Sequence, residues 1–333
     1  MVLKDVFKRP LLDLRISVTD RCNMRCRYCM PREHFDKNHV YLPKSDILSF
    51  EEIVRVVESL LPAGLRKVRL TGGEPLIRKD LYKLIEQLRE LSPDLDIALT
   101  TNAQLLSKSI QDLKKAGLSR VTVSLDALDV DVYQAMGDTT STPDNIIESI
   151  DKTLALGIPV KVNTVVQKGV NEHQIIPLIS KIGSRNIPIR FIEYMDVGAT
   201  NSWNLDHVMT GKEMRHLIEN EFGLIQPIEP DHPSDVARTY RTDSGSIIGF
   251  IESISNPFCG DCSRARLSAN GSIYTCLFAT EGFDLRGILR MDATKQDITS
   301  AISAIWNQRK DRYSETRSEK TDLNRIEMSF IGG

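Results

Sequence analysis

Short apolar runs alternate with amphipathic helical patterns along the first two thirds of the chain. The segments between the apolar runs repeat their apolar residues with a helical period of about 3.6. Ser49 and Glu52 have the spacing of a capping box at the start of one such helix, and Leu81, Leu84 and Leu88 lie on one face of the next. The runs rich in β-branched residues are predicted strands at 13–19, 67–73, 96–102, 120–126, 159–167 and 188–195.

This alternation makes six βα steps, which implies parallel strands joined by right-handed crossovers. No GxGxxG motif follows the first strand, which argues against a dinucleotide-binding sheet. Six units are also too few for a closed eight-stranded barrel. We therefore predict an α/β fold in which residues 1–225 form a partial (βα)6 TIM-like barrel that is open on one side.

The pattern changes after about residue 225, where shorter strand-like runs and polar, proline-containing stretches begin. The turn at 269–272 lies between two of these runs and predicts a hairpin. We expect residues 226–333 to form a smaller α+β domain that closes the open side of the barrel. The charged segment 310–322 is expected to be solvated, and we assign no function to it.

The chain has 333 residues, of which 41% are apolar and 26% charged, as in a soluble globular protein. Its net charge of −2 provides no overall field that would attract nucleic acid or an anionic membrane. No apolar run approaches the length of a membrane span, and the N-terminal residues do not have the pattern of a signal peptide. We expect a cytoplasmic protein that binds neither nucleic acid nor membranes.

All six cysteines fall into two triplets, with spacings C-x3-C-x2-C and C-x2-C-x13-C. Such tight spacing in a long chain indicates metal binding rather than a disulfide framework. Three thiolates suit a 4Fe–4S cluster in which one iron keeps an open position, because a cubane normally takes four cysteines. Zinc is the alternative at both triplets, with His34 or His39 as a fourth ligand at the first, and it is more serious at the second because C-x2-C is common in zinc sites.

The segment CNMRCRYC, residues 22–29, resembles the cysteine signature of the radical S-adenosylmethionine enzymes, and TGGEP at 71–75 resembles the motif that binds the methionine end of their cofactor. The resemblance implies a 4Fe–4S cluster on Cys22, Cys26 and Cys29. It also implies that S-adenosylmethionine, bound at the open iron, is cleaved to a 5′-deoxyadenosyl radical that abstracts hydrogen from a substrate. The cofactor contacts that it implies are Tyr28, Gly72, Gly73, Glu74, Ser124 and Met195.

Nearly the whole chain resembles one branch of that superfamily, the GTP 3′,8-cyclases of molybdenum cofactor biosynthesis. The resemblance rests on LRISVTDRCN at 14–23, on RAR at 264–266 after the second C-x2-C, and on the terminal Gly-Gly. It implies conversion of GTP to (8S)-3′,8-cyclo-7,8-dihydroguanosine 5′-triphosphate by a carbon–carbon bond-forming lyase. A second 4Fe–4S cluster, whose open iron binds guanine, would be held by Cys259, Cys262 and Cys276.

The same resemblance implies roles for further residues and partners. The implied partners are a flavodoxin- or ferredoxin-type electron donor, a cyclic pyranopterin monophosphate synthase that receives the product, and a second copy of the chain in a homodimer. Catalytic roles fall to Arg264, Arg266, Gly332 and Gly333. The implied GTP contacts are Arg15, Arg69, Thr100, Lys161, Arg264, Ala265 and Arg266.

Independently of any resemblance, several predicted strands carry one cation within an apolar run: Arg15, Arg69, Lys161 and Arg190. An unpaired buried charge is costly, so each cation needs an anion. Each could pair with a structural carboxylate, or all four could converge on one polyanion such as a nucleoside triphosphate. Arg190 is predicted as a substrate contact from this pattern alone.

Two other functions fit parts of the sequence. A peptide-modifying radical enzyme with an auxiliary cluster would have a peptide groove in place of a basic cavity. A zinc-stabilised binding protein would contain zinc and no iron, and would have no catalytic activity.

Overall fold

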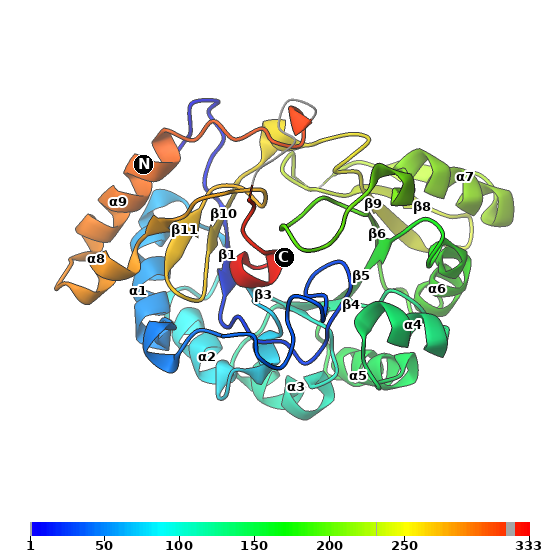
Figure 1. The fold of residues 1–333 in the computed structure, drawn as a ribbon, viewed down its shortest axis with the longest axis horizontal. Coiled ribbons are helices and arrows are strands. Elements are labelled where there is room, and N and C mark those ends of the chain that lie inside the picture. The colour runs from blue at the N-terminus through cyan, green and yellow to red at the C-terminus, as the bar shows by residue number, and fades with distance from the viewer. Residues whose placement is uncertain (1, 231, 318–323) are drawn as a thin grey trace.

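The computed structural model describes residues 2–230, 232–317 and 324–333. Its centre is a curved sheet with strands in the order β12-β11-β10-β1-β2-β3-β4-β5-β6-β9-β8-β7. Helices cover the convex side of this sheet in an outer arc, and the C-terminus lies inside the arc (Figure 1).

The strands are β1 (Asp13–Ser17), β2 (Lys67–Thr71), β3 (Asp96–Thr101), β4 (Arg120–Ser124), β5 (Val160–Val166), β6 (Ile189–Glu193), β7 (Gln226–Ile228), β8 (Arg238–Arg241), β9 (Ile247–Ile251), β10 (Arg264–Leu267), β11 (Ser272–Tyr274) and β12 (Phe283–Asp284). The helices are α1 (Phe50–Leu60), α2 (Leu81–Leu91), α3 (Leu106–Lys115), α4 (Val130–Gly137), α5 (Pro143–Ala155), α6 (Ile175–Gly183), α7 (Gly211–Phe222), α8 (Arg286–Arg290), α9 (Lys295–Asn307) and α10 (Met328–Ile331).

The six predicted strands are confirmed as β1 to β6, and each pairs in parallel with the next. A helix follows each strand, so the chain forms six βα units. The sheet is open, because its pairing runs from β12 to β7 without closing in the described residues. This is the predicted partial (βα)6 barrel.

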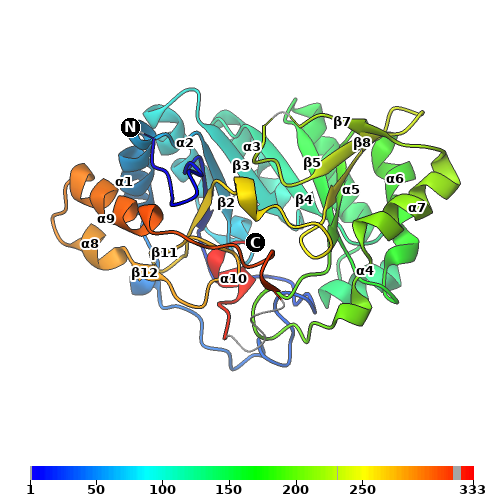
Figure 2. The same cartoon turned by 90° about the horizontal axis from the view of Figure 1, so that it is seen from above.

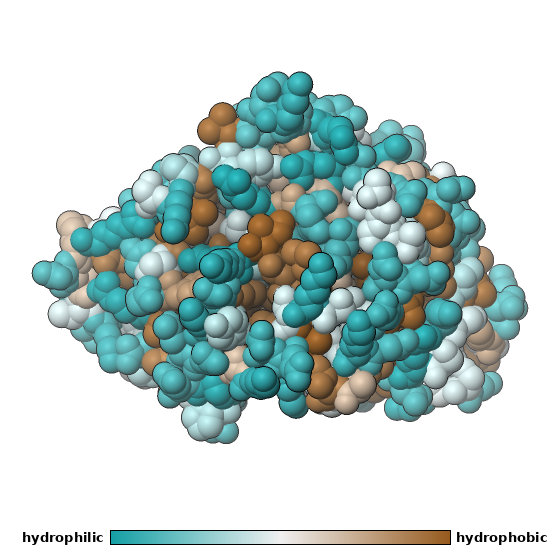
Figure 3. Space-filling view, turned by 90° about the horizontal axis from the view of Figure 1, so that it is seen from below, coloured by the Kyte–Doolittle hydropathy of each residue, from teal (hydrophilic) through white to brown (hydrophobic). Residues whose placement is uncertain are grey.

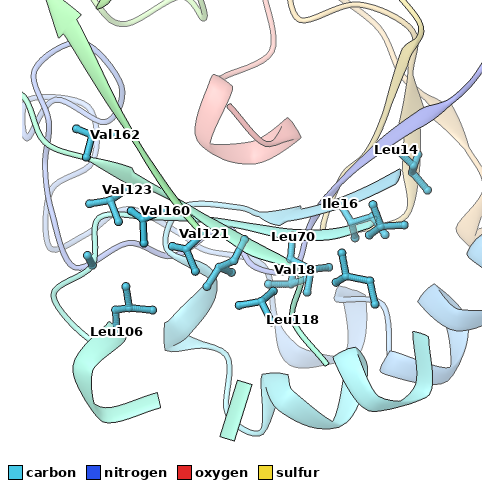
Figure 4. Close-up of a cluster of buried hydrophobic side chains, with 14 of the residues drawn as sticks. Leu14, Ile16, Val18, Leu70, Leu106, Leu118, Val121, Val123, Val160 and Val162 are labelled. Carbon is cyan, nitrogen blue, oxygen red and sulfur yellow. The ribbon is translucent and has the colours of Figure 1, made fainter. Parts of the chain in front are cut away.

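The barrel strands separate an apolar outer layer from a polar inner face, because successive side chains of a strand point to opposite sides. Leu14, Ile16 and Leu70 are fully buried towards the helices, together with Val121 and Val123 of β4. Figure 4 shows these side chains on the helix side of the sheet and α10 on the other side. The inner face is therefore free to carry polar chemistry.

The predicted helix start at Ser49 is confirmed. Its side chain accepts a hydrogen bond from the Glu52 backbone, and the Glu52 side chain accepts one from the Ser49 backbone. The predicted apolar stripe of α2 is buried as well. These helices thus have the ends and faces that the sequence pattern predicts.

The C-terminal strands extend the barrel sheet at both edges. β10 pairs in parallel with β1, and β9 pairs in parallel with β6. The predicted hairpin at 269–272 is confirmed as the antiparallel pair β10–β11. The boundary predicted near residue 225 falls between α7 and β7, and strands from both sides of it share one sheet; the division into two domains stays a prediction.

The prediction that segment 310–322 is solvated is wrong for some side chains of its described part, 310–317. Tyr313 is only 6% exposed, and Arg317 forms an ion pair with the buried Asp196. The local sequence is polar, but a distant carboxylate and an aromatic ring draw these side chains inward. Residues 318–322 lie outside the described residues.

Polar side chains dominate the face shown in Figure 3, and apolar ones gather there in small groups. No helix in the described ranges combines the length and apolar character that a membrane crossing requires.

Candidate active site

Both cysteine triplets face one cavity of about 720 Å³ on the inner side of the sheet. The two edges of the sheet flank this space, and the C-terminal tail lies between them (Figures 1 and 2). All six cysteines line the cavity, together with inward-facing residues of the barrel strands. The structure thus brings together two cysteine triplets that are more than 200 residues apart in the sequence.

The first triplet lies on the loop that follows β1, and Arg25 holds this loop in shape. The Arg25 guanidinium donates to the carbonyl oxygens of Cys22 (2.9 Å) and Phe35 (2.8 Å) and to the Tyr41 hydroxyl (2.7 Å). The Cys22 sulfur accepts a hydrogen bond from the backbone of Met24 at 3.4 Å. An internal arginine therefore orders a loop that has no regular secondary structure.

Gly72 and Gly73 allow the end of β2 to pack directly on the cysteine loop. A Cβ atom at Gly72 would lie 2.5 Å from the Thr19 carbonyl oxygen, and one at Gly73 would lie 2.3 Å from the Arg21 carbonyl oxygen. Gly72 also has a φ of 146°, a conformation that other residues rarely adopt. The absence of side chains at these two glycines therefore lets TGGEP pack against the loop that carries the first triplet.

The other predicted cofactor contacts, Tyr28, Glu74, Ser124 and Met195, all line the cavity. The Tyr28 hydroxyl donates to Asp126 at 2.6 Å. The Glu74 carboxylate accepts from Thr101 Oγ1 and from the Asn102 backbone, both at 2.8 Å. Burial raises the pKa of Glu74 to about 7 despite these hydrogen bonds.

The second triplet lies at the edge of the sheet, around β10 and β11. Cys262 Sγ accepts hydrogen bonds from Arg309 (3.2 Å) and Arg264 (3.4 Å). Burial favours the neutral thiol of Cys262, but the charges of Arg264 and Arg309 outweigh it and lower the pKa to about 6. Burial, and then Asp311, raises the pKa of Cys276 to about 12. Positive charge at this triplet is therefore concentrated beside Cys262.

The predicted cations converge on the space between the two triplets. The strand register places Arg266, Arg15 and Arg69 side by side on three neighbouring strands. Lys161 and Arg190 line the same cavity from β5 and β6. Thr100 also lines it and accepts a hydrogen bond from Arg69 at 2.9 Å.

Carboxylate pairing does not account for these cations. None of Arg15, Arg69, Lys161, Arg190, Arg264 and Arg266 has a carboxylate oxygen within 4.0 Å among the described residues. Two other cavity cations do have partners: Lys67 lies 3.1 Å from Asp13, and Arg120 lies 2.6 Å from Asp96.

Each of these unpaired cations except Arg264 has a lowered pKa. Burial, followed by repulsion from Arg69 and Arg264, lowers the pKa of Arg15 to about 9. Burial and then the neighbouring Arg190 lower the pKa of Lys161 to about 8. The cavity therefore holds an excess of positive charge that a bound polyanion would neutralise.

Ala265 differs from the other predicted GTP contacts. It lies between Arg264 and Arg266 on β10, so its side chain points to the opposite face. There it is 1% exposed and belongs to the apolar core. The structure does not bring its side chain to the cavity.

The C-terminal tail enters the site. Gly333 lines the cavity, and Gly332 is buried against Thr71, whose methyl group would lie 2.5 Å from a Cβ atom at Gly332. Glu327 anchors the tail by accepting a hydrogen bond from the Ala199 backbone at 3.0 Å. Glycine at 332 is needed for this contact and for its φ of 78°.

The sequence analysis does not identify five residues that line the cavity: Lys67, Arg120, Asp126, Asn163 and Arg309. A signal for the first four exists, because each lies two residues from a predicted or inward-facing position on the same strand or just after it. Arg309 lies just after α9, and no motif in the surrounding sequence indicates that it belongs to the site.

The donor set at each triplet, three thiolates facing the cavity, fits a 4Fe–4S cluster with one open iron. Among the described residues, no three His, Cys, Asp or Glu side chains converge as ligands of one metal ion. His39 instead packs its ring between Phe35 and Tyr41, each 4.7 Å away. A cubane distributes its thiolates over separate irons, so its three sulfurs need not meet at a point. Arginines beside Cys262 also suit a group of net negative charge.

Comparison with known proteins gives matches over the whole chain. The family model of the Radical SAM superfamily matches residues 16–182, and that of Molybdenum Cofactor Synthesis C matches residues 187–315. The chain is 46% identical to the GTP 3′,8-cyclase of Staphylococcus haemolyticus (strain JCSC1435), with 99% of both chains covered. It is also 46% identical to the GTP 3′,8-cyclase of Staphylococcus epidermidis (strain ATCC 12228), covering 100% of this chain and 99% of that one.

Solved structures show likeness in fold. Streptococcus suis SuiB bound to S-adenosylmethionine matches with a TM-score of 0.63 at 18% identity, covering 94% of this chain and 70% of that chain. SuiB bound to its precursor peptide SuiA gives the same TM-score of 0.63. At this identity the match supports the barrel architecture alone.

Proposed function

This chain belongs to the GTP 3′,8-cyclase family of the radical SAM superfamily, and we propose that it converts GTP to (8S)-3′,8-cyclo-7,8-dihydroguanosine 5′-triphosphate. This carbon–carbon bond-forming lyase reaction would be the first step of molybdenum cofactor biosynthesis. The observation that carries the proposal is the row of cations without carboxylate partners between two cysteine triplets in one cavity. A triphosphate supplies the missing negative charge.

In this proposal the two triplets hold two 4Fe–4S clusters. The first, with S-adenosylmethionine, supplies when bound a 5′-deoxyadenosyl radical that takes the ribose 3′ hydrogen of GTP. Cys22, Cys26 and Cys29 would hold the first cluster, and Cys259, Cys262 and Cys276 would hold the second, beside which the guanine would bind.

The side chains of the cavity position the substrate. Arg15, Arg69 and Arg266 present adjacent guanidinium groups, which bind phosphate oxygens in a bidentate manner. Lys161 and Arg190 add charge from the opposite strands. Placement of the triphosphate fixes the ribose relative to the first triplet, which is the positioning on which a radical abstraction depends.

Arg264 and Arg266 have a second role in the proposal. Both side chains point into the cavity from β10, beside Cys262. Fixed positive groups in a site that excludes water stabilise negative charge that develops during reaction. Gly332 and Gly333 bring bare backbone close to the same space, where a Cβ atom at Gly332 would clash with Thr71 and one at Gly333 with Met328.

We further propose a cytoplasmic homodimer that takes electrons from a flavodoxin- or ferredoxin-type protein and passes its product to a cyclic pyranopterin monophosphate synthase. The resemblance to the GTP 3′,8-cyclases is the support for these assignments. They identify the reductant and the recipient to supply in a reconstituted assay.

An anaerobic assay tests the function. Reconstituted protein with reductant, S-adenosylmethionine and GTP should form 5′-deoxyadenosine in a GTP-dependent manner, together with the cyclised triphosphate. ATP and a peptide serve as alternative substrates. If either supports turnover as well as GTP does, the substrate assignment fails.

Two cysteine variants separate the roles of the triplets. Cys26→Ala should abolish cleavage of S-adenosylmethionine, whereas Cys276→Ala should leave the first cluster in place and lose GTP turnover. Full cyclisation by Cys276→Ala would show that the second triplet has another role. Protein that contains zinc and no iron after reconstitution would contradict both assignments.

A further inference from the structure

The second triplet lies on short, irregular segments that regular secondary structure does not fix. Cys259 opens a single 3-10 turn, Cys262 precedes β10, and Cys276 follows β11. Precise metal ligation needs other contacts to hold three such segments in register.

Two arginines supply those contacts at all three segments. Arg9 donates to the carbonyl oxygen of Cys259 at 2.7 Å. Arg309 donates to the carbonyl oxygen of Cys262 at 2.7 Å and to that of Thr275, the neighbour of Cys276, at 3.0 Å. Every ligand segment of the second triplet is therefore tied to a buried guanidinium group.

One carboxylate joins the two arginines. Asp5 lies 2.5 Å from Arg9 and 3.3 Å from Arg309, and all three residues are at most 4% exposed. The Trp306 ring lies 4.6 Å from the Arg309 guanidinium, and its indole donates to the Arg9 carbonyl oxygen at 3.2 Å. The N-terminal segment and the end of α9 thus form one rigid support.

Arg309 also contacts a ligand atom directly, because its Nη2 lies 3.2 Å from Cys262 Sγ. A cationic donor at a ligand sulfur stabilises the more negative, reduced state of an iron–sulfur cluster and so raises its reduction potential. The guanidinium fork allows the same side chain to hold the backbone and the sulfur at once.

We propose that the buried Asp5–Arg9–Arg309 network is a positioning device for the second cluster, and that Arg309 raises the reduction potential of that cluster. The inference rests on the second cluster of the proposed function. It makes residues 5–9, at the far end of the chain from α9, an essential part of that metal centre.

The test uses a Cys26→Ala parent, in which only the second triplet can hold a complete cluster. Arg309→Met and Arg309→Lys are added to this parent, and Arg312→Met is the matched control. Arg312 is an exposed neighbour that pairs with Glu315 and contacts no cysteine. Iron per chain and the midpoint potential of the cluster, followed by electron paramagnetic resonance, are measured after anaerobic reconstitution.

Arg309→Met should lower the midpoint potential and weaken retention of the cluster by about 10- to 100-fold in chelator competition, as is typical when a residue that orients metal ligands is removed. Arg309→Lys keeps the positive charge but loses the forked guanidinium group. It should therefore change the midpoint potential less than it weakens retention of the cluster. Arg312→Met should match the parent.

Should Arg309→Met fail to fold, Arg9→Lys tests the same network through its contact with Cys259, with cluster retention as the readout. A parent with a cluster, combined with variants of unchanged potential and retention, overturns this inference alone. A parent that binds no cluster overturns the second-cluster assignment, and the inference with it.

Discussion

At the scale of single residues, the inward cations determine what the cavity can bind. Arg15, Arg69, Lys161 and Arg190 could be predicted, because a lone charge stands out in an apolar strand. Lys67 and Arg120 were missed, since each begins its strand and looks like a solvated end. Which cations have carboxylate partners depends on strand register, which the sequence alone does not define.

Lys161 gives the site a pH dependence. Its pKa in the free protein is lowered from 10.5 to about 8, chiefly by burial. A bound triphosphate favours the charged amine and raises this pKa, so binding takes up a proton above about pH 8. The affinity for GTP should therefore fall as pH rises above 8, by at most about tenfold per pH unit.

Calorimetric titration of GTP at pH 8.5 in buffers of different ionisation enthalpy measures this proton uptake. Lys161→Met should remove most of it, whereas Lys114→Met, at an exposed position on α3, should not. Equal proton uptake by wild type and Lys161→Met would assign the titration to another group.

At the scale of elements, the barrel helices could be predicted but the contacts of the C-terminal tail could not. α1 has an explicit start signal, and its stability is a local property. Ser49→Ala removes the hydroxyl that caps Glu52 and should lower the free energy of unfolding by about 1 kcal/mol. Urea denaturation measures this loss, and the exposed Ser300→Ala on α9 should change it by less than about 0.5 kcal/mol. Equal effects would mean that the capping box does not stabilise α1.

The tail depends on a carboxylate far away in the sequence. Asp196 lies in the loop that follows β6. Its carboxylate accepts a hydrogen bond from the Tyr313 hydroxyl (2.6 Å) and forms ion pairs with Arg317 (3.0 Å) and Arg325 (2.9 Å). The sequence around Tyr313 and Arg317 has no local pattern that indicates these contacts, so composition alone predicts that segment 310–322 is solvated. The partners of a charged segment are defined by the fold, not by its composition.

Asp196→Asn should therefore loosen the tail. The substitution leaves Arg317 and Arg325 without a counter-charge and should cost about 3 kcal/mol of unfolding free energy. Hydrogen exchange should become faster in residues 324–333, whereas Asp292→Asn, at an exposed position, should leave exchange there unchanged. Unaltered protection of the tail in Asp196→Asn would show that its other contacts, such as those of Glu327 with Ala199 and of Ile326 with Ala279, are sufficient to hold it.

At the scale of the whole molecule, the βα alternation predicts the barrel because each unit is encoded locally. The extension of the sheet by β10 and β9 at opposite edges was not predicted, since it depends on pairing between distant segments. This extension has a functional consequence. It carries the second triplet, together with Arg264 and Arg266, to the side of the cavity next to β1.

The resulting cavity has more positive charge than its own carboxylates balance, so ligand charge should govern stabilisation of the whole protein. GTP carries about four negative charges, and each phosphate removed gives up part of the neutralisation. Thermal unfolding should show stabilisation in the order GTP, GDP, GMP, guanosine. A ligand present at 100 times its Kd adds about 2.7 kcal/mol of stability, and added salt should reduce the differences within the series.

Arg69→Gln should reduce the difference in stabilisation between GTP and guanosine, because Arg69 is held only by two threonine hydroxyls among the described residues. The exposed Lys114→Gln should not change it. Stabilisation by guanosine equal to that by GTP would mean that the cations serve the protein rather than the triphosphate.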